Sequence, residues 1–261
     1  DLSYGIFGNQ PQYFIVATPN LINIPGFTAI SEPPVFSKDS GTYSGSFFLE
    51  LASPSPTAEI RYTLDGQTPT TASLKYTAPI PISGTREILA RAYEPGRMPS
   101  EVVSRTYIAL ANDVLNFSSD LPLVIIDTGR QSVNTTYRLV RSAFIDRGAD
   151  GRARITDQPD YAGRGGMKRR GRSTLGAAKG SYGFEVWDEN NLDRKVSIFG
   201  LPGESDWILY APFSFDRALI NNAFMHALSN QIGRYSVRTR FVEVYLNTND
   251  DIVSAGDYVG L

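Results

Sequence analysis

Between residues 29 and 109, apolar and polar residues alternate in short runs that are separated by turn-forming residues. In AEIRYTLDG, for example, Ile60, Tyr62 and Leu64 fall on one face of an extended chain. Similar runs are GSFFLELAS, REILARAYEPG and SEVVSRTYIAL, and no helical periodicity interrupts them. Short strands that recur at roughly 8–12 residues are typical of a β-sandwich, which the pattern therefore predicts here.

The stretch RYTLDGQTPT marks a corner between two of these strands. Asp65-Gly66 is a favoured hairpin dipeptide, because both residues tolerate the backbone angles that a tight turn requires. Pro69 follows closely and has no N–H to donate to a neighbouring strand. We therefore expect a turn at Asp65-Gly66 and no central strand directly after it.

From about residue 110 the pattern changes. The compact apolar run LPLVIIDTG, residues 121–129, predicts a strand that is buried on both faces. Further strands are predicted over GSYGFEVWDENN, KVSIFGLP, SDWILYAPF and RFVEVYLN.

One segment of this second region, SFDRALINNAFMHALSNQIGR, has helical periodicity. Ser214 is placed to cap the helix, Asp216 would lie in its first turn, and Gly233 is placed to end it. Four apolar residues spaced four apart form a stripe that we expect to face a core: Ile220, Phe224, Leu228 and Ile232. The second region is therefore predicted to be α+β.

Composition excludes several classes of function. The net charge of −2 indicates no field that would attract nucleic acid, so we expect no nucleic-acid partner. The chain has no cysteine, which excludes disulfides, thiolate metal sites and a cysteine nucleophile. Its single histidine, His226, excludes a metal site with several histidines. No run reaches the roughly 18 apolar residues of a membrane-spanning helix, and we expect no membrane span.

Residues 29–109, centred on YTLDGQTPT, resemble the small sandwich module at the C-terminus of chitobiases and β-hexosaminidases. The resemblance implies an immunoglobulin-like fold without catalytic residues of its own. Such modules are spacers or binding appendages of exported proteins, so the resemblance leaves open a role as a carbohydrate-binding accessory.

The region from about residue 120 resembles the N-terminal half of the CotH family, which are spore-coat-type atypical protein kinases. The matching phrases include LPLVIIDT, RRGRSTLGAAKGSYGFEVWDENN, GLPGESDWILYAPFSFDRALINNAFMHALSNQIGRYSVRTRFVEVYLN and GDYVGL. The opening DLSYGIFGNQPQYFIVATPNLIN is similar to the tail of a lamin-tail-type domain.

These resemblances predict a multi-domain chain in which an all-β immunoglobulin-like sandwich precedes an α+β kinase-like N-terminal lobe. Residues 1–28 would be a connector or the tail of a preceding domain, residues 29–109 the sandwich, and residues 110–261 a CotH-like domain that is incomplete at its C-terminus. The chain opens without Met and closes on an apolar run, which we interpret as a fragment or the ordered part of a larger protein.

A kinase needs cations for the nucleotide phosphates and carboxylates for magnesium. The glycine-containing turn in KRRGRSTLGAAKGSYGFE presents Arg170, Arg172 and Ser173, and Lys179 follows at the start of a strand. Backbone N–H groups and a lysine can together hold phosphate. The resemblance makes Lys179 the first candidate, although Gly180 stands where the family has a second cation. The alternative is a solvated basic loop supported by Asp157 and Asp160.

We predict no catalytic and no metal-binding residue in this chain, because the resemblance places the family's acids beyond GDYVG. Asp127 is expected at a strand end, Glu185 at a solvent-facing strand position and His226 at the surface of the helix. The acids of DGRARITDQPD are spaced somewhat like a calcium loop but lack its closing glutamate, so only a looser Ca²⁺ site stays open.

The chain is therefore expected to be a fragment of a large exported bacterial surface protein, with a structural or assembly role. The alternatives are part of an ATP- and Mg²⁺-dependent kinase that phosphorylates secreted or coat proteins, and a carbohydrate-binding accessory. No cofactor is expected in the fragment, whereas the resemblance implies ATP and Mg²⁺ for the full-length parent. The expected partners are other domains of the same protein and surface or coat proteins, at an extracellular or cell-surface location.

Overall fold

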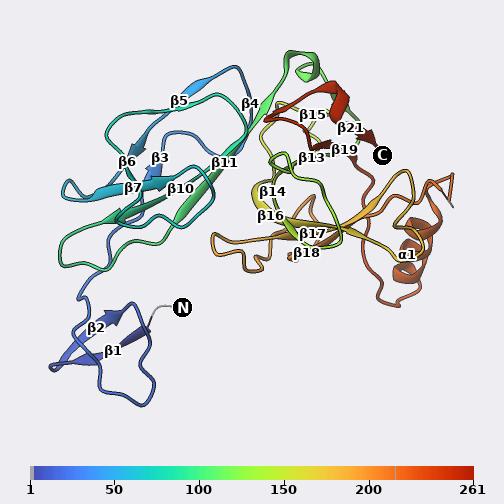
Figure 1. Ribbon diagram of the computed structural model, residues 1–261. Coiled ribbons are helices and arrows are strands. Elements are labelled where there is room, and N and C mark those ends of the chain that lie inside the picture. The colour runs from blue at the N-terminus through green and yellow to red at the C-terminus, as the bar shows by residue number, and fades with distance from the viewer. Residues whose placement is uncertain (1–2, 215) are drawn as a thin grey trace. The chain divides into compact units, whose positions relative to one another are not determined.

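A computed structural model describes residues 3–214 and 216–261, and it is mostly β (Figure 1). The described residues contain a single α-helix, α1 (Asn221–Gln231). The chain divides into two compact units, which are treated separately below. The first unit comprises Asp1–Asp39, Phe47–Ile82 and Glu87–Arg105, and the second comprises Ser40–Ser46, Ser83–Arg86 and Thr106–Leu261.

The first unit contains small antiparallel strand pairs and three antiparallel strands of a six-stranded sheet. The pairs are β1 (Ser3–Phe7) with β2 (Gln10–Phe14), β3 (Val35–Phe36) with β6 (Leu51–Ala52), and β5 (Phe47–Leu49) with β9 (Ile80–Ile82). β7 (Glu59–Thr63) pairs with both β8 (Leu74–Lys75) and β10 (Arg86–Tyr93). Alternate residues of these strands are buried, among them Leu49, Ile60, Ile80 and Ile82. The prediction of an all-β region with sandwich-like sheets is confirmed.

The predicted corner after β7 is also confirmed. Gly66 has a φ of 77°, in the left-handed region that favours glycine. The Asp65 carboxylate accepts a hydrogen bond from the backbone N–H of Gln67 at 3.1 Å, which closes the turn. No strand runs through Pro69, and its carbonyl instead accepts a hydrogen bond from the Tyr93 hydroxyl at 2.7 Å.

The second unit contains a seven-stranded sheet. Its order is β18 (Asp206–Leu209), β17 (Ser181–Val186), β16 (Tyr161–Arg170), β14 (Arg138–Ile145), β13 (Leu123–Asp127), β19 (Glu243–Asn247) and β21 (Tyr258–Gly260). Neighbouring strands are antiparallel except β13 and β19, which are parallel. The remaining elements are β4 (Gly41–Ser44), β11 (Val103–Leu110), η1 (Asn112–Val114), β12 (Ser118–Ser119), β15 (Ala153–Arg154), β20 (Ile252–Val253) and η2 (Ala255–Asp257).

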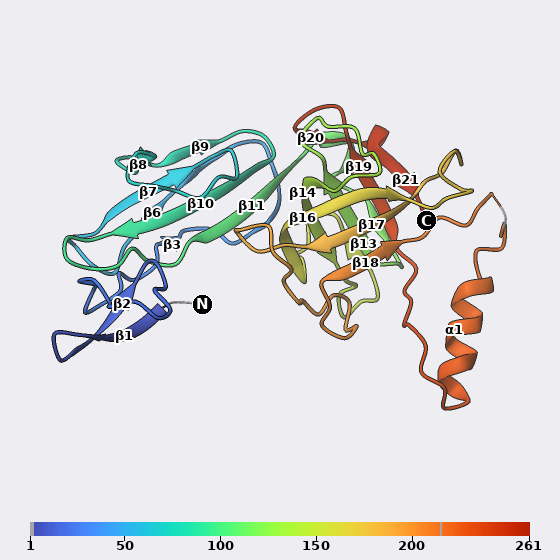
Figure 2. The same cartoon turned by 60° about the horizontal axis from the view of Figure 1, so that its bottom comes forward.

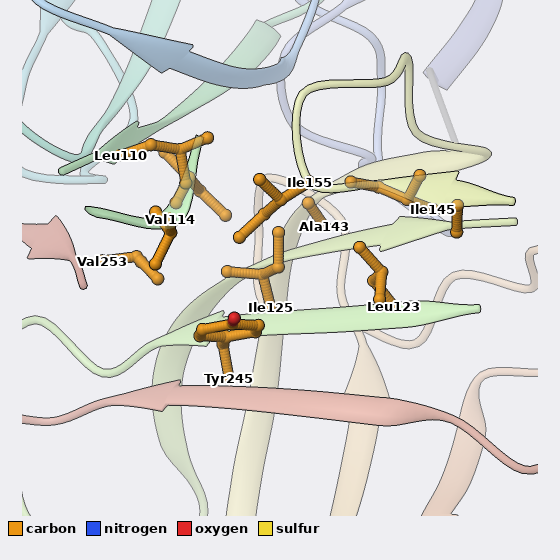
Figure 3. Close-up of a cluster of buried hydrophobic side chains, with 11 residues drawn as sticks. Leu110, Val114, Leu123, Ile125, Ala143, Ile145, Ile155, Tyr245 and Val253 are labelled. Atoms are coloured by element: carbon orange, nitrogen blue, oxygen red, sulfur yellow. The ribbon is translucent and has the colours of Figure 1, made fainter. Parts of the chain in front are cut away.

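Strand β13 is buried on both faces, as its continuous apolar run predicts. Leu123 and Ile125 belong to one buried cluster, together with Tyr245 of β19 and Val253 (Figure 3). Val124 and Ile126 point to the opposite face and pack in a second cluster that includes Phe144, Phe184 and Phe199. The centre of the second unit is thus a sheet with an apolar layer on each side.

One predicted strand is wrong. Residues 195–202 form a turn with a single bridge between Val196 and Glu204. Phe199 and Gly200 have φ angles of 55° and 68°, which no strand accommodates. Ile198 and Phe199 are nevertheless buried in the second cluster, so the apolar run reflects burial in a loop.

Helix α1 begins later than predicted. Leu219 has a φ of 61°, which interrupts the helical path between Ser214 and Asn221. The Asp216 carboxylate accepts a hydrogen bond at 2.8 Å from the backbone N–H of Asn221, the first residue of the helix. Ser214 does not cap the helix. The predicted end at Gly233 is confirmed. Its φ is 82°, and its N–H and that of Arg234 donate back to the carbonyls of Asn230 and Ser229, as in a Schellman motif.

The prediction that the apolar stripe of α1 faces a core is wrong. Ile220, Phe224, Leu228 and Ile232 are 53%, 61%, 38% and 65% exposed, and no residue of α1 is buried. Figure 2 shows the helix extending away from the sheet. The physical reason is that each side of the sheet's centre already has its own apolar cluster, and no residue of α1 belongs to either.

Replacing Asp216 by alanine should loosen the first turn of α1 by about 1 kcal/mol, because the N–H of Asn221 loses its acceptor. Hydrogen exchange of the amides in α1 measures the effect, and Asp216→Asn is the control because it retains a side-chain oxygen. Equal protection in all three proteins would show that this contact does not stabilise the helix.

Candidate functional site

The predicted phosphate-binding residues lie at the turn between β16 and β17, which spans residues 171–180. Gly171 has a φ of 117°, and a Cβ at this position would collide with the Thr174 hydroxyl. The Arg169 guanidinium crosses the turn and donates to the Ala177 carbonyl at 2.6 Å. A Cβ on Gly180 would lie 2.6 Å from the Arg169 Cζ, so a larger residue there would displace the Arg169 guanidinium.

Lys179 is half-buried at the end of this turn. Its ammonium group donates a hydrogen bond to the backbone carbonyl of Leu261. Burial lowers the pKa of Lys179 from its usual value, and the negative charge of Glu243 partly opposes that shift. The fold therefore brings Lys179 from the turn into the electrostatic range of a carboxylate on β19.

Glu243 is held in a cluster of hydroxyl groups and aromatic rings. Its carboxylate accepts hydrogen bonds from the Ser119 hydroxyl at 3.2 Å and from the Tyr258 hydroxyl. Burial, followed by the charge of Glu243, raises the pKa of Tyr245 to about 12, and burial together with the hydrogen bond to Glu243 does the same for Tyr258. The Phe117 ring lies 5.3 Å from that of Tyr245 and 5.8 Å from that of Tyr258. We call Ser119, Glu243, Tyr245 and Tyr258 the Glu243 cluster.

The sequence analysis did not single out Glu243. The available signal was a carboxylate at a polar position of the strand-forming run FVEVYLN. Of the four predicted residues, the structure brings Lys179 into the electrostatic range of the cluster, whereas Arg170 is exposed at the end of β16 and Arg172 and Ser173 are exposed on the turn. Their role in binding phosphate stays a prediction.

A second polar group lies at the carboxyl end of β13. Asp127, which is 1% exposed, accepts hydrogen bonds from the N–H of Gly129 at 3.0 Å and from the Asn247 amide at 3.1 Å. The Arg141 guanidinium lies 3.5 Å from the same carboxylate. Burial raises the pKa of Asp127 to about 6, although the charge of Arg141 opposes the shift. Asp127 is thus the strand-end residue that the sequence predicts.

The other singled-out residues make structural contacts. Glu185 was predicted to face solvent, but it is half-buried and accepts a hydrogen bond from the Trp187 indole at 3.0 Å. The Nδ1 of His226 lies 2.7 Å from the Ser236 hydroxyl, which connects α1 to the segment after it.

The acids of the suggested calcium loop bind protein groups. The carboxylate of Asp157 accepts from the N–H of Arg154 at 2.8 Å, and that of Asp160 accepts from the N–H of Phe199 at 3.2 Å. Neither of these contacts involves the 171–180 turn, which Asp157 and Asp160 were suggested to support. Within residues 3–214 and 216–261, no three histidine, aspartate or glutamate side chains are grouped so that they could hold a metal ion.

Two family models match this chain. Residues 38–104 match the one described as chitobiase/beta-hexosaminidase C-terminal domain, and residues 167–261 match the one described as CotH kinase protein. A CotH-type domain follows a chitobiase-type module in this chain. The resemblances to the chitobiase-type module and to the CotH family are confirmed, and together they indicate a module of a surface- or coat-type protein, whereas the lamin-tail-type resemblance of the opening residues stays a prediction.

Other comparisons add little. No curated protein matches the chain. One solved structure, described as the D00-D0 domain of Intimin, is 14% identical and covers 68% of this chain and 100% of its own, with a TM-score of 0.21. In the part of the chain that the structure describes, no helix is long and apolar enough to cross a membrane.

Proposed function

We propose that this chain is a structural or assembly module of an exported bacterial surface- or coat-type protein. The observation that carries the proposal is the exposed apolar stripe of α1. Exposed apolar surface of this kind marks an interaction site, because its burial against a partner is favourable. The order of a chitobiase-type module and a CotH-type domain supports the same role, with other domains of the same protein or coat proteins as partners and an extracellular location.

A second candidate function is phosphoryl transfer from ATP by a kinase-like lobe that includes the seven-stranded sheet and α1. The position of Lys179 beside Glu243 favours it, since kinases commonly hold their phosphate-binding lysine close to a glutamate. Lys179 would bind the nucleotide phosphates, and Arg170, Arg172 and Ser173 would line the approach. These cations fit a triphosphate. The described residues do not gather carboxylates that fit Mg²⁺, so we derive no step through the metal.

The two functions differ in what Mg-ATP should do to stability. A ligand that binds only the native protein at a hundredfold excess over its Kd stabilises it by about 2.7 kcal/mol. We expect the thermal unfolding midpoint to stay unchanged in millimolar Mg-ATP. A shift in the wild type and in Lys195→Met that disappears in Lys179→Met would contradict a purely structural role and support nucleotide binding. Lys195 is the matched control, because it is an exposed lysine of the same unit.

Carbohydrate binding by the chitobiase-type module stays a third prediction. The first unit has an open hollow whose lining includes Ser55, Thr57 and Tyr76 together with the ion pair of Glu59 and Lys75. Hydroxyl groups beside an aromatic ring suit a neutral sugar, so this hollow is where binding should be tested.

A further inference from the structure

Helix α1 directs its polar face toward the segment that directly follows it and leaves its apolar stripe exposed. The Asn230 amide donates to the His226 carbonyl at 2.9 Å and to the Ser236 carbonyl at 3.1 Å, and its oxygen accepts from the Ser236 N–H at 3.0 Å. His226 binds the Ser236 hydroxyl from the same side of the helix. A surface helix of a folded protein has the opposite orientation, with its apolar face packed inward.

The outward stripe lies on one side of the helix, with the polar residues Asn221 and Gln231 in the same arc at its two ends. At 100° per residue, four of its members fall within about a third of the helix circumference, and a fifth apolar residue, Met225, lies beside them. All are exposed. We call Ile220, Phe224, Met225, Leu228 and Ile232 the α1 stripe. The hydrogen bonds of Asn230 and His226 hold Ser236, in the segment after the helix, against the opposite side of α1. The stripe is therefore left uncovered on a helix that is already formed.

The exposed charges that flank α1 most closely in the sequence are positive, whereas the Asp216 carboxylate at the start of the helix is buried. Residues 217–242 contain four arginines and no aspartate or glutamate. Arg217 precedes the helix, and Arg234 and Arg238 follow it, all of them exposed. Arg240 differs, because its guanidinium is paired with Asp146 at 3.2 Å.

This charge pattern selects among the surfaces that could cover the stripe. A second copy of α1 would bring the same arginines together, and like charges across an interface are unfavourable. A helix that lies in a lipid surface carries cations along its polar face, whereas the polar face here consists of Asn, Ser and His side chains that already bind the chain itself. A protein groove with carboxylates at its edge would bury the apolar side chains of the stripe and place negative charges beside the arginines.

We infer that the α1 stripe docks into a groove of another protein, apolar at its centre and acidic at its rim. This inference rests on the proposed assembly role and specifies its partner. Binding buries the stripe, and Arg217, Arg234 and Arg238 pair with the carboxylates of the rim.

The test uses two soluble designed helical hairpins that share one apolar groove, one rimmed by glutamates and the other by lysines. Fluorescence anisotropy measures their binding to the full chain. We expect the glutamate-rimmed hairpin to bind at least tenfold more tightly at low salt, and the difference to narrow at 0.5 M salt because screening weakens the charge pairs. Phe224→Ser combined with Leu228→Ser should abolish binding, whereas Leu192→Ser, at an exposed leucine elsewhere, should not.

Arg234→Gln combined with Arg238→Gln should remove the preference for the acidic rim while apolar binding persists. Circular dichroism of each variant checks that α1 is intact. Equal binding of the two hairpins, or no binding of either, would overturn the inference. So would dimerisation in sedimentation experiments that depends on Phe224, or capture by phosphatidylglycerol vesicles. Dimerisation or vesicle capture through the stripe would exclude an acidic protein groove but leave an interaction role for α1, so the partner class can fail while the proposed assembly role stands.

Discussion

Replacing Arg141 with methionine should destabilise the second unit by about 3 kcal/mol at pH 8 and by less than about 1 kcal/mol at pH 5. At pH 8 the wild-type Asp127 is ionised, and Arg141 supplies its neighbouring positive charge. Removing one partner of a buried pair leaves an uncompensated charge, which costs about 3–5 kcal/mol in known cases. At pH 5 Asp127 is mostly protonated, and the loss of Arg141 matters little.

The direction follows from the pKa of Asp127, which is raised from 3.8 to about 6 in the folded protein. A carboxyl group whose folded pKa is raised contributes most to stability at low pH, and that contribution is lost as the pH rises through about 6. Without Arg141 the pKa of Asp127 rises further, so the free energy of unfolding continues to fall up to a higher pH. Urea denaturation at the two pH values measures the difference.

Adding Asp127→Asn to Arg141→Met provides the control for this prediction. Asp127→Asn and the double variant both lack a carboxyl group to titrate at this position, so the free energy of unfolding of the double variant relative to Asp127→Asn alone should be nearly the same at pH 5 and pH 8. If Arg141→Met alone lowers the free energy of unfolding equally at pH 5 and pH 8, the charge of Asp127 does not determine the effect. Arg141 then stabilises the unit through packing of its side chain.

Replacing Gly165 with alanine should destabilise the second unit by about 3 kcal/mol or more. A Cβ at Gly165 would collide with the backbone carbonyl of Glu185 and would lie 2.7 Å from the Cζ of Phe184. Phe184 is 1% exposed, so its ring has no free space to move into. Overpacking of this kind typically costs about 1–3 kcal/mol, and a collision with backbone moves the strand itself.

Gly176→Ala is the matched control for Gly165→Ala. Gly176 lies in the turn that follows β16, and a Cβ there would meet nothing within 4 Å. Its substitution should change the free energy of unfolding by no more than about 0.5 kcal/mol. Chemical denaturation compares the two variants. Similar stabilities would show that β16 and β17 can separate to admit a methyl group, and that Gly165 is not required for their close approach.

The elements that the sequence predicts well are those whose pattern depends on local chemistry. The apolar run ending at Asp127 is a strand buried on both faces, Gly66 occupies the turn after β7, and Gly233 ends the helix. β14 and β16 were not predicted. β16 reads YAGRGGMKRR, in which glycines and cations obscure strand propensity. Two of its glycines, Gly165 and Gly166, are explained by the side chains of Phe184 and Trp187 that pack against them in the folded sheet.

The candidate site likewise contains residues that could be predicted from the sequence and residues that could not. The basic turn and Lys179 could be identified from residue types alone, because cations and glycine in a turn have a recognisable chemistry. Glu243 could not, because it lies 64 positions further along the chain in numbering, and only the folded sheet brings its charge close to Lys179. Asp127 was placed correctly at a strand end, but its raised pKa depends on burial that periodicity does not measure.

By itself, the sequence determined the all-β first region, the buried strand β13, the corner at Asp65-Gly66, the end of α1 and the two family resemblances, because each depends on residues that are near neighbours in the chain. Only the tertiary structure decided that the apolar stripe of α1 faces outward, that Lys179 lies close to Glu243, and that Asp127 is buried beside Arg141. Periodicity shows which residues share a face of a helix or strand. What that face contacts depends on which other surfaces the fold has already covered.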